Sequence, residues 1–507
     1  MAEVLGWGIL PAFFIGLAAS WAIEGLLRPR PVMAWRRPFR ANLTHVGVVL
    51  IGFSLELALF RRPYFAMANV LALELVVVLV SRAKDHALQE PFVFPDFEYF
   101  TDAIRHPRLY LPFFGWGNAL ATAAGFGGAL WVGLSVEPEI ATQAGPLFFP
   151  GIALTVAAGT ALAAWAAKGL KVEFDAASDL RRLGIFSALW AYGRAERQCT
   201  VTARAAAPFQ SRRPSRLPSS LPDLVSVQSE SFFDVRRSYP LVKNEVLAGF
   251  DALRQESLLW GELDVAARGA NTVRTEFAFL SGMDVDALGV HRYNPYRRFA
   301  GEGVPTVASY LKSLGYRTIC VHPFHGSFYR RDKVLPKLGF DEFFDLKAFE
   351  GVEKAGAYVS DRALGEFVSS LLKRNGQQPL YIHVITMENH GPLHWEPVTD
   401  EDAEEFLSGP LPKGCEDLVA YARHLRNADA MFSDLRRTLL TNGRPAGLCI
   451  YGDHVPIMPK VYGSLGAVSG TTDMVIWTTG EQSADGETGP HGITRLARDF
   501  LSRLGLI

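Results

Sequence analysis

Long apolar stretches in the first third of the chain constrain the fold more than any other feature of the sequence. Five of them, near residues 5–27, 42–60, 64–81, 111–135 and 147–168, are long enough to cross a bilayer, which takes ~20 residues of helix. Residues 1–170 are therefore predicted to form a transmembrane domain of five helices. The first stretch has no small-residue cleavage site before a soluble domain, so we expect it to be retained.

Two carboxylates lie inside these apolar stretches, Glu56 in the second and Glu74 in the third. Ionisable residues within spans face a neighbouring helix, sit near a span end, or serve a function. The sequence leaves these interpretations open.

The basic residues between the spans indicate on which side of the membrane the C-terminal domain lies. The loop after the first span carries Arg28, Arg30, Arg36, Arg37 and Arg40. Further basic residues follow the third and fifth spans: Arg82, Lys84, Arg105, Arg108, Lys168, Lys171, Arg181 and Arg182. Counted by the positive-inside tendency, this pattern places the large C-terminal domain in the cytoplasm.

Residues 171–222 are expected to connect two domains. An amphipathic juxtamembrane helix is predicted over 172–202, with Leu180, Leu183, Phe186 and Leu189 near helical spacing. Residues 203–222 are rich in Pro, Ser and Arg, which is typical of a linker.

The net charge of −1 gives no global reason to expect a nucleic-acid partner. None of the four cysteines has metal-like spacing.

From residue 223 to 507 strand-like and helix-like runs alternate, which predicts a largely parallel sheet covered by helices on both faces. Strands are expected near 224–228, 318–322, 380–386, 448–451 and 474–478, and helices near 242–256, 304–314, 360–374, 414–440 and 491–504. In such α/β domains, functional residues gather at the carboxyl ends of the strands.

Polar residues stand where this architecture would place a site. Glu230 follows the first strand, and the pair Asp453 and His454 follows the strand at 448–451. Thr272 lies in a polar turn before an apolar run. A threonine hydroxyl is nearly inert at neutral pH and needs a base or a metal to activate it. These four residues could hold one divalent ion, and the mixed carboxylate and imidazole ligands suit Mn or Zn better than Mg.

Two further residues could bind the non-bridging oxygens of a phosphoryl group. They are Arg331 and His390, and His390 follows the strand at 380–386. A surface ion pair for Arg331 and a structural turn for His390 are the simpler alternatives.

The order of these motifs resembles the lipoteichoic acid synthase and phosphoglycerol transferase branch of the alkaline phosphatase–sulfatase superfamily. The matching segments are 228–232, 271–277, His322 with 328–332, 389–390 and 451–454. They occur in the family's order over nearly all of residues 223–507. The five preceding spans also resemble the family's layout.

The resemblance implies Thr272 as the nucleophile, and Glu230, Thr272, Asp453 and His454 as ligands of one catalytic metal, commonly Mn or Mg. It also implies that Tyr329, Arg331 and His390 contact a phosphoglycerol group, with His322 nearby. Tyr329 departs from the Trp of the synthases, and Arg274 stands where some relatives have an acidic residue. Both departures bear on the acceptor more than on the reaction.

Members of this branch take glycerol phosphate from phosphatidylglycerol, release diacylglycerol and pass the group to a glycolipid or glycan acceptor. The donor lipid is available on the outer leaflet, so the resemblance implies a bacterial inner-membrane protein with an extracytoplasmic catalytic domain. This conflicts with the basic loops. One reconciliation is that the arginines of 28–40 and 82–108 bind anionic headgroups outside the membrane.

Three alternatives are weighed against this interpretation. A sulfatase needs Cys or Ser in a CxPxR-like sequence, and the segment from Cys320 to Phe324 lacks the arginine and the spacing. A phosphoethanolamine transferase of the same superfamily is favoured by several disulfides, which four scattered cysteines do not suggest. A non-catalytic membrane sensor would not need all four metal-site residues.

Overall fold

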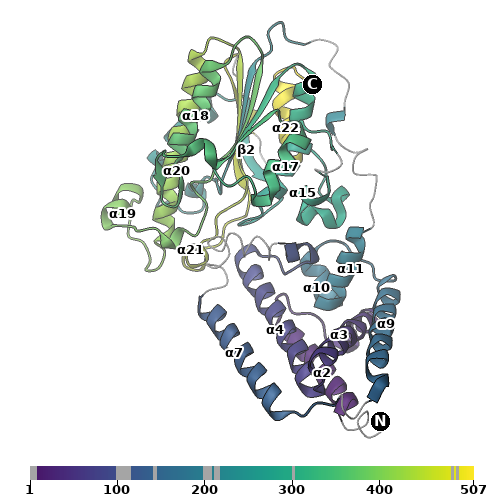
Figure 1. Cartoon of the computed structure of the whole chain (residues 1–507). Coiled ribbons are helices and arrows are strands. Elements are labelled where there is room, and N and C mark those ends of the chain that lie inside the picture. Colours follow the sequence, from purple (N-terminus) through teal and green to yellow (C-terminus); the bar gives the residue numbers. More distant parts are fainter. Residues whose placement is uncertain are drawn as a thin grey trace. The chain divides into compact units, whose positions relative to one another are not determined.

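The computed structural model describes residues 8–98, 116–140, 145–197, 208–210, 217–299, 303–480, 485–486 and 490–507. The chain forms two compact units, Met1–Cys199 and Thr200–Ile507 (Figure 1).

The first unit is helical. Its long helices are α2 (Leu10–Ile23), α3 (Phe39–Phe60), α4 (Pro63–Leu88), α7 (Trp116–Val136) and α9 (Phe148–Ala167). By length and composition, α3, α4 and α9 can each cross a membrane, whereas the described apolar parts of the other two are shorter, Leu10–Leu26 and Ala123–Val136. The described residues therefore contain three full-length candidate spans where the sequence predicts five. Residues 5–7 and 111–115 of the expected spans lie outside the described part.

Close packing of α3 on α9 explains two small residues in these apolar helices. A Cβ on Gly47 would lie 2.7 Å from the carbonyl oxygen of Gly159 and 2.9 Å from the Cβ of Ala163. Without a solvent-driven hydrophobic effect, helices in a bilayer associate largely through such close backbone approach. A larger residue at position 47 would therefore separate the two helices.

The two carboxylates of the spans have different surroundings. Glu56 accepts a hydrogen bond from Asn69 Nδ2 on α4 at 3.4 Å, so it faces a neighbouring helix. Glu74 is buried, and neither of its carboxylate oxygens has a hydrogen-bond partner in the described part of the chain.

Part of the basic loop after α2 is engaged within the first unit. Arg37 is buried, pairs with Glu24 and donates from Nε to the carbonyl of Val32 at 2.7 Å. The Arg40 guanidinium lies 5.3 Å from the ring centre of Trp165. The expectation that this loop holds lipid headgroups is therefore wrong for Arg37. Arg105 and Arg108 lie outside the described residues.

The juxtamembrane segment forms two helices where one was predicted. They are α10 (Ala176–Leu183) and α11 (Ile185–Arg197). Gly184 between them has φ of 79° and ψ of 165°, a conformation that glycine adopts readily and that ends a helix. Within the expected linker, Phe209 is buried against Tyr310 of the second unit, with 6.2 Å between ring centres.

The second unit is built on a nine-stranded sheet, in the order β10-β2-β9-β8-β1-β7-β3-β4 with β11 beside β2. The strands are β1 (Asp223–Ser229), β2 (Leu259–Asp264), β3 (Arg317–Val321), β4 (Glu342–Phe344), β7 (Leu380–Ile385), β8 (Ala446–Gly452), β9 (Thr472–Thr478), β10 (Asp485–Gly486) and β11 (His491–Gly492). The central strands β8, β1, β7, β3 and β4 run parallel, and β9 is antiparallel to both β8 and β2.

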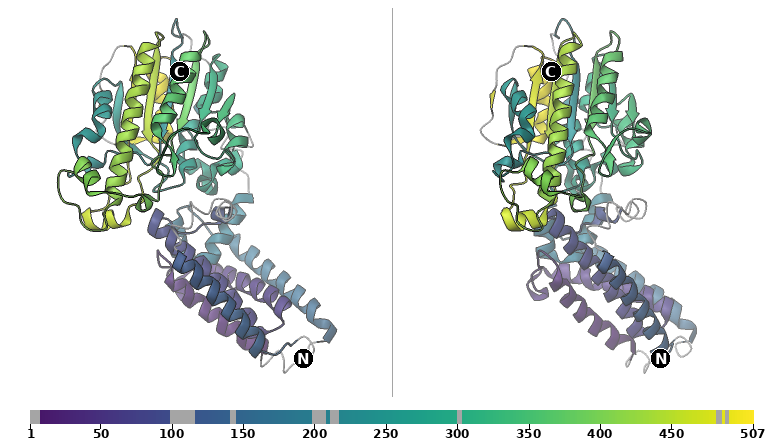
Figure 2. Two further views of the ribbon diagram at one scale, coloured as in Figure 1. Left: turned by 60° about the vertical axis from the view of Figure 1, so that its left-hand side comes forward. Right: turned by 90° about the vertical axis from the view of Figure 1, so that its left-hand side faces the viewer.

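Helices cover both faces of this sheet, as Figure 2 shows. Val225 and Val227 of β1 pack with side chains of α18 (Asp361–Arg374) and α20 (Asp417–Thr441). Leu224 points the other way, into a core with α14 (Thr272–Ser281), α16 (Val307–Ser313) and α22 (Ile493–Arg503). The predicted α/β fold with a largely parallel sheet is confirmed.

The strand register fixes where the polar residues after each strand lie. Ser229 at the end of β1 pairs with Gly452 at the end of β8, and Gln228 pairs with Ile385 at the end of β7. The residues that follow, Glu230 and Asp453 among them, therefore leave the sheet at the same edge.

Candidate metal and phosphate site

Three side chains converge at the carboxyl ends of β1 and β8. His454 Nε2 lies 3.3 Å from Glu230 Oε1 and 3.5 Å from Asp453 Oδ2. Their ligand atoms all lie within 4.8 Å of one another, and all three residues are buried. His454 Nδ1 lies 3.2 Å from the Val455 carbonyl, which fixes the proton on Nδ1 and leaves the lone pair of Nε2 facing the two carboxylates.

This arrangement fits a bound cation. Burial, followed by the charge of Asp453, raises the pKa of the Glu230 carboxyl to about 8. Asp453 Oδ2 has no hydrogen-bond partner among the described residues, although it is buried. Two carboxylates and an imidazole with converging lone pairs are a common ligand set for Zn and Mn, and a divalent ion would satisfy all three.

The loop after β1 is held from several directions. Ser231, with φ of 54°, donates its backbone N–H to Asp453 Oδ1 at 2.8 Å and its hydroxyl to Glu230 Oε1 at 3.1 Å. Gly452 leaves room for this turn, since a Cβ there would lie 1.8 Å from the carbonyl oxygen of Phe232. From α20, the Tyr421 hydroxyl donates to the Ser231 carbonyl at 2.7 Å.

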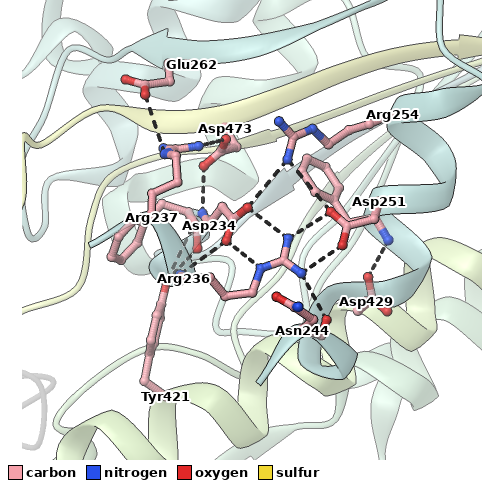
Figure 3. A network of polar contacts seen from close by, with 12 residues as sticks. Asp234, Arg236, Arg237, Asn244, Asp251, Arg254, Glu262, Tyr421, Asp429 and Asp473 are labelled. Carbon is pink, nitrogen blue, oxygen red and sulfur yellow. Dashed lines mark hydrogen bonds and ion pairs between the residues drawn. The ribbon is translucent and has the colours of Figure 1, made fainter. Parts of the chain in front are cut away.

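A charged network anchors the end of the same loop (Figure 3). The backbone N–H of Asp234 donates to Asp473 Oδ2 on β9 at 2.6 Å. The Asp234 carboxylate accepts from Arg236, whose guanidinium also binds both carboxylate oxygens of Asp251 at 2.8 Å. Arg237 pairs with Asp473 as well. This network ties the segment that follows Glu230 to the sheet and to α13 (Ala248–Gln255).

Thr272 is the first residue of α14. Asn271 before it has φ of 65°, a left-handed conformation that asparagine tolerates better than most residues. On the same turn, Thr275 donates its hydroxyl to the carbonyl of Asp453 at 2.8 Å. The helix start that carries the expected nucleophile therefore contacts the segment that carries two expected ligands.

Arg331 begins α17 (Arg331–Val334) and is only 1% exposed. Its NH2 donates to Glu276 Oε2 at 2.6 Å and its Nε to the same oxygen at 3.2 Å. Tyr296 donates its hydroxyl to Glu276 as well. The alternative of a surface ion pair is therefore wrong, because Arg331 forms a buried pair with Glu276 of α14.

His322 follows β3 and contacts Arg331 directly. Its Nδ1 lies 3.1 Å from the Ile385 carbonyl and its Nε2 lies 3.2 Å from Arg331 NH1. A carbonyl oxygen can only accept a hydrogen bond and a guanidinium can only donate one. His322 Nδ1 therefore donates to the Ile385 carbonyl, and Nε2 accepts from Arg331. Burial first, and then the charge of Arg331, lower the pKa of His322 well below its usual value.

Tyr329 lies in a strained turn beside this pair. Tyr329 and Arg330 have φ of 53° and 57°, and two consecutive non-glycine residues in the left-handed region are costly. The half-buried Tyr329 ring lies 5.2 Å from the Arg331 guanidinium.

His390 ends a turn after β7. Its Nδ1 lies 2.8 Å from the Gly391 carbonyl, to which it donates, so Nε2 carries the lone pair. The neighbouring Asn389 donates from Nδ2 to the Glu230 carbonyl at 3.2 Å. The His390 turn is thus tied to the metal-ligand loop.

The structure therefore brings Glu230, Asp453 and His454 into direct contact, and Arg331 and His322 into a second cluster. The charge of Arg331 counteracts the rise in the pKa of Glu230, so the two clusters interact electrostatically. Sequence reasoning missed several residues that hold them, namely Ser231, Glu276, Tyr296, Asn389 and Tyr421. Glu276 alone had a signal, a carboxylate one helical turn after Thr272 and directly before the apolar run 277–280.

Comparison with known proteins identifies the family of the second unit. The sulfatase family model matches residues 225–506. The capsular polysaccharide biosynthesis protein RkpI of Rhizobium meliloti (strain 1021) is 28% identical over 445 residues, which cover 82% of this chain and 78% of that protein. Lipoteichoic acid synthase 1 of Bacillus subtilis (strain 168) is 27% identical over 142 residues, 28% of this chain and 21% of that protein.

Among solved structures, the lipooligosaccharide phosphoethanolamine transferase EptA of Neisseria meningitidis, an integral membrane protein, has the same fold. It aligns with a TM-score of 0.58 over 98% of this chain and 95% of its own, at 14% identity. The chain therefore belongs to the sulfatase family, in the lipoteichoic acid synthase-like branch of the alkaline phosphatase–sulfatase superfamily.

Proposed function

We propose that the protein is a membrane-anchored phosphoglycerol transferase that uses phosphatidylglycerol as donor and Thr272 as nucleophile. The observation that carries this proposal is the cluster of Glu230, Asp453 and His454, whose backbone is bonded to the helix that begins with Thr272. A hydroxyl nucleophile beside a cation site suits phosphoryl transfer. Because the position holds threonine, conversion to the formylglycine of sulfate-ester hydrolases is not available to it.

The site would hold one divalent metal through Glu230, Asp453, His454 and Thr272, with Mn favoured and Mg or Zn as alternatives. When bound, this metal lowers the pKa of the Thr272 hydroxyl and neutralises charge on the phosphoryl oxygens. Arg331 would bind the non-bridging oxygens, which a guanidinium does well because its N–H groups form a fork. Tyr329, His390 and the neighbouring His322 would line the glycerol phosphate site.

The reaction would proceed in two displacements at phosphorus. Thr272 Oγ gives up its proton and bonds to phosphorus, the bond to the diacylglycerol oxygen breaks, and diacylglycerol leaves as the alcohol after taking up a proton. An acceptor hydroxyl then attacks the glycerol-phosphoryl threonine and loses its proton, and the Thr272 oxygen leaves phosphorus and takes up a proton. One nucleophile thus serves both half-reactions.

The acceptor is proposed to be a glycolipid or glycan of the bacterial envelope. Similarity to a capsular polysaccharide biosynthesis protein supports a glycan. We place the protein in the inner membrane with its catalytic domain outside the cytoplasm, where the donor lipid is available. Of the basic residues that favour the opposite orientation, Arg37 is paired with Glu24, which reduces the charge that it contributes.

The test is diacylglycerol release by the purified full-length protein in detergent. Labelled phosphatidylglycerol, phosphatidylethanolamine and an aryl sulfate are each incubated with Mn²⁺, with EDTA, and with the variant Thr272→Ala. Metal-dependent release from phosphatidylglycerol that is lost in the variant is expected. Preferential cleavage of phosphatidylethanolamine would assign a different headgroup, and hydrolysis of the sulfate would overturn the transferase proposal.

A further inference from the structure

The expected nucleophile and the expected phosphate-binding arginine are connected through a single helix. Thr272 and Glu276 lie four residues apart on α14, so their side chains share one face of the helix. Glu276 binds Arg331 through both Nε and NH2. The position of Arg331 relative to Thr272 is therefore set through one turn of helix.

The contacts of Arg331 also determine which of its donors can serve a ligand. A guanidinium has five N–H groups. Glu276 takes Nε–H and one N–H of NH2, and His322 Nε2 takes one N–H of NH1. Among the described residues, these bonds leave one N–H on each terminal nitrogen unused. Two such donors on one guanidinium can bind two oxygens of a phosphate together.

Two neighbours keep Glu276 and His322 in these roles. Tyr296 donates to Glu276, and its ring packs edge-on against Phe277 at 6.2 Å. The Ile385 carbonyl holds the proton of His322 on Nδ1, so that Nε2 stays an acceptor. All four side chains, Glu276, Tyr296, His322 and Arg331, are buried, so water cannot replace a lost contact.

We infer that Glu276 is a positioning residue that, with Tyr296 and His322, orients Arg331 so that two of its N–H groups face the phosphoryl group attacked by Thr272. The inference rests on the proposed function for its reaction, but the orientation of Arg331 applies to any phosphoryl ligand of the site. A misplacement of about 1 Å at such a group costs on the order of 10²-fold in rate.

The test is a double-mutant cycle between Glu276 and Arg331 with two readouts. The first is kcat/KM for diacylglycerol release, and the second is the Kd for inorganic phosphate, measured by calorimetry with Mn²⁺ bound. Glu276→Gln should lower kcat/KM at least tenfold and weaken phosphate binding at least fivefold. In an Arg331→Ala background, the same change should alter either quantity less than twofold. Equal effects in both backgrounds would show a merely structural role and overturn the inference.

Two further variants test whether misfolding, rather than a change in the orientation of Arg331, causes the loss of activity and phosphate affinity. Tyr296→Phe removes one hydrogen bond from Glu276 but keeps the ring, and should weaken phosphate binding two- to fivefold only when Arg331 is present. Asp223→Asn neutralises another buried carboxylate, which accepts from Leu380 N–H and pairs with Arg444 at the opposite end of β1. It should lower the melting temperature without changing phosphate affinity.

The two proposals can fail separately. One outcome is that wild-type protein releases no diacylglycerol while the phosphate Kd still shows the expected coupling between Glu276 and Arg331. In that case phosphatidylglycerol is not the donor, and the role of Glu276 stands. If wild-type protein turns over phosphatidylglycerol and Glu276→Gln matches it in both readouts, the role of Glu276 is overturned. Absence of any Arg331-dependent phosphate binding would also overturn it.

Discussion

Glu230 Oε1 and His454 Nε2 lie 3.3 Å apart, and a His454 that carries its proton on Nδ1 has none on Nε2 to donate to the carboxyl group. Asp453 Oδ2 adds a third acceptor, 3.5 Å from the same nitrogen. Converging lone pairs in a buried site are unfavourable unless a cation lies between them. A divalent ion bound between these atoms would therefore stabilise the folded protein.

Metal removal should lower thermal stability. At a metal concentration 100 times Kd, binding to the folded state alone contributes about 2.7 kcal/mol, which corresponds to roughly 5–10 °C for a domain of this size. Scanning calorimetry with Mn²⁺ and with EDTA measures this shift. Glu230→Gln should abolish most of it, whereas Asp223→Asn should retain it. An EDTA-insensitive melting temperature in the wild type would contradict a metal site here.

Thr272→Ala should abolish turnover, by at least roughly 10³-fold, because no other group replaces the nucleophile. The metal-dependent shift in melting temperature should persist in part, since three ligands remain. Mass spectrometry of protein quenched during turnover should find glycerol phosphate on the peptide that contains Thr272. Thr272→Ser is the matched control, because it keeps a hydroxyl and should keep measurable activity. Modification of a different peptide would reassign the nucleophile.

The sequence was sufficient to predict that Glu230 and Asp453 lie close together, for a simple geometric reason. Glu230 and Asp453 each follow an apolar run, and parallel strands place such residues at one edge of a sheet. The register of β1 and β8 then brings them into contact. The five predicted strands and five predicted helices of the second unit lie within a few residues of β1, β3, β7, β8, β9, α16, α18, α20 and α22, except that the predicted helix at 242–256 begins with a 3-10 turn before α13. The sequence did not predict β2, β4 or α14.

The residues that hold the cluster could not be predicted, because their partners are distant in the chain and have no local pattern. Tyr421 lies in the second turn of a 25-residue helix, where a tyrosine is ordinarily a core residue. Arg331 is predicted from the sequence as a phosphate ligand, with a surface ion pair as the alternative, but its burial against Glu276 is not.

Tyr421→Phe should destabilise the loop that carries Glu230. The Tyr421 hydroxyl donates to the Ser231 carbonyl and accepts the backbone N–H of Phe233 at 3.2 Å, in a fully buried position. Its removal leaves buried backbone groups unpaired, at a cost of about 1–3 kcal/mol in the free energy of unfolding. Metal affinity should fall about tenfold, as for other residues that orient metal ligands. Calorimetric Mn²⁺ titration and urea unfolding measure the two effects, and unchanged metal affinity would contradict the role.

His322 should remain neutral, with its proton on Nδ1, across the range in which histidine ordinarily titrates. Burial and the charge of Arg331 lower its pKa well below the usual value. The two nitrogen chemical shifts of His322 in 15N-labelled protein should be unchanged between pH 8 and 5. Since the unfolded chain binds this proton near pH 6.5 and the folded protein does not, stability should fall as the pH drops below 6.5. Protonation of His322 near pH 6.5 would contradict the hydrogen bond from Arg331.

His424 should make stability depend on pH in the opposite direction. Burial acts to lower its pKa, but hydrogen bonds to Glu388 and Glu396, at 2.8 and 2.9 Å, outweigh this and raise the pKa to about 9. The charged neighbours are these two glutamates, Asp361 near Glu388, and Arg423, which pairs with Glu396.

The protonated imidazole is thus the form that the fold stabilises, and its contribution is complete below the unfolded pKa of about 6.5. It is lost as the pH rises through 9, with a slope of at most about 1.4 kcal/mol per pH unit. Urea unfolding from pH 6 to 10 should show this decline in the wild type and a flatter curve in His424→Gln. Because Glu388 immediately precedes Asn389 and His390, the same variant should also lower kcat/KM at pH 7. If the free energy of unfolding changes with pH in the same way in both proteins, His424 is neutral in the folded state and the turn of Asn389 and His390 is held in another way.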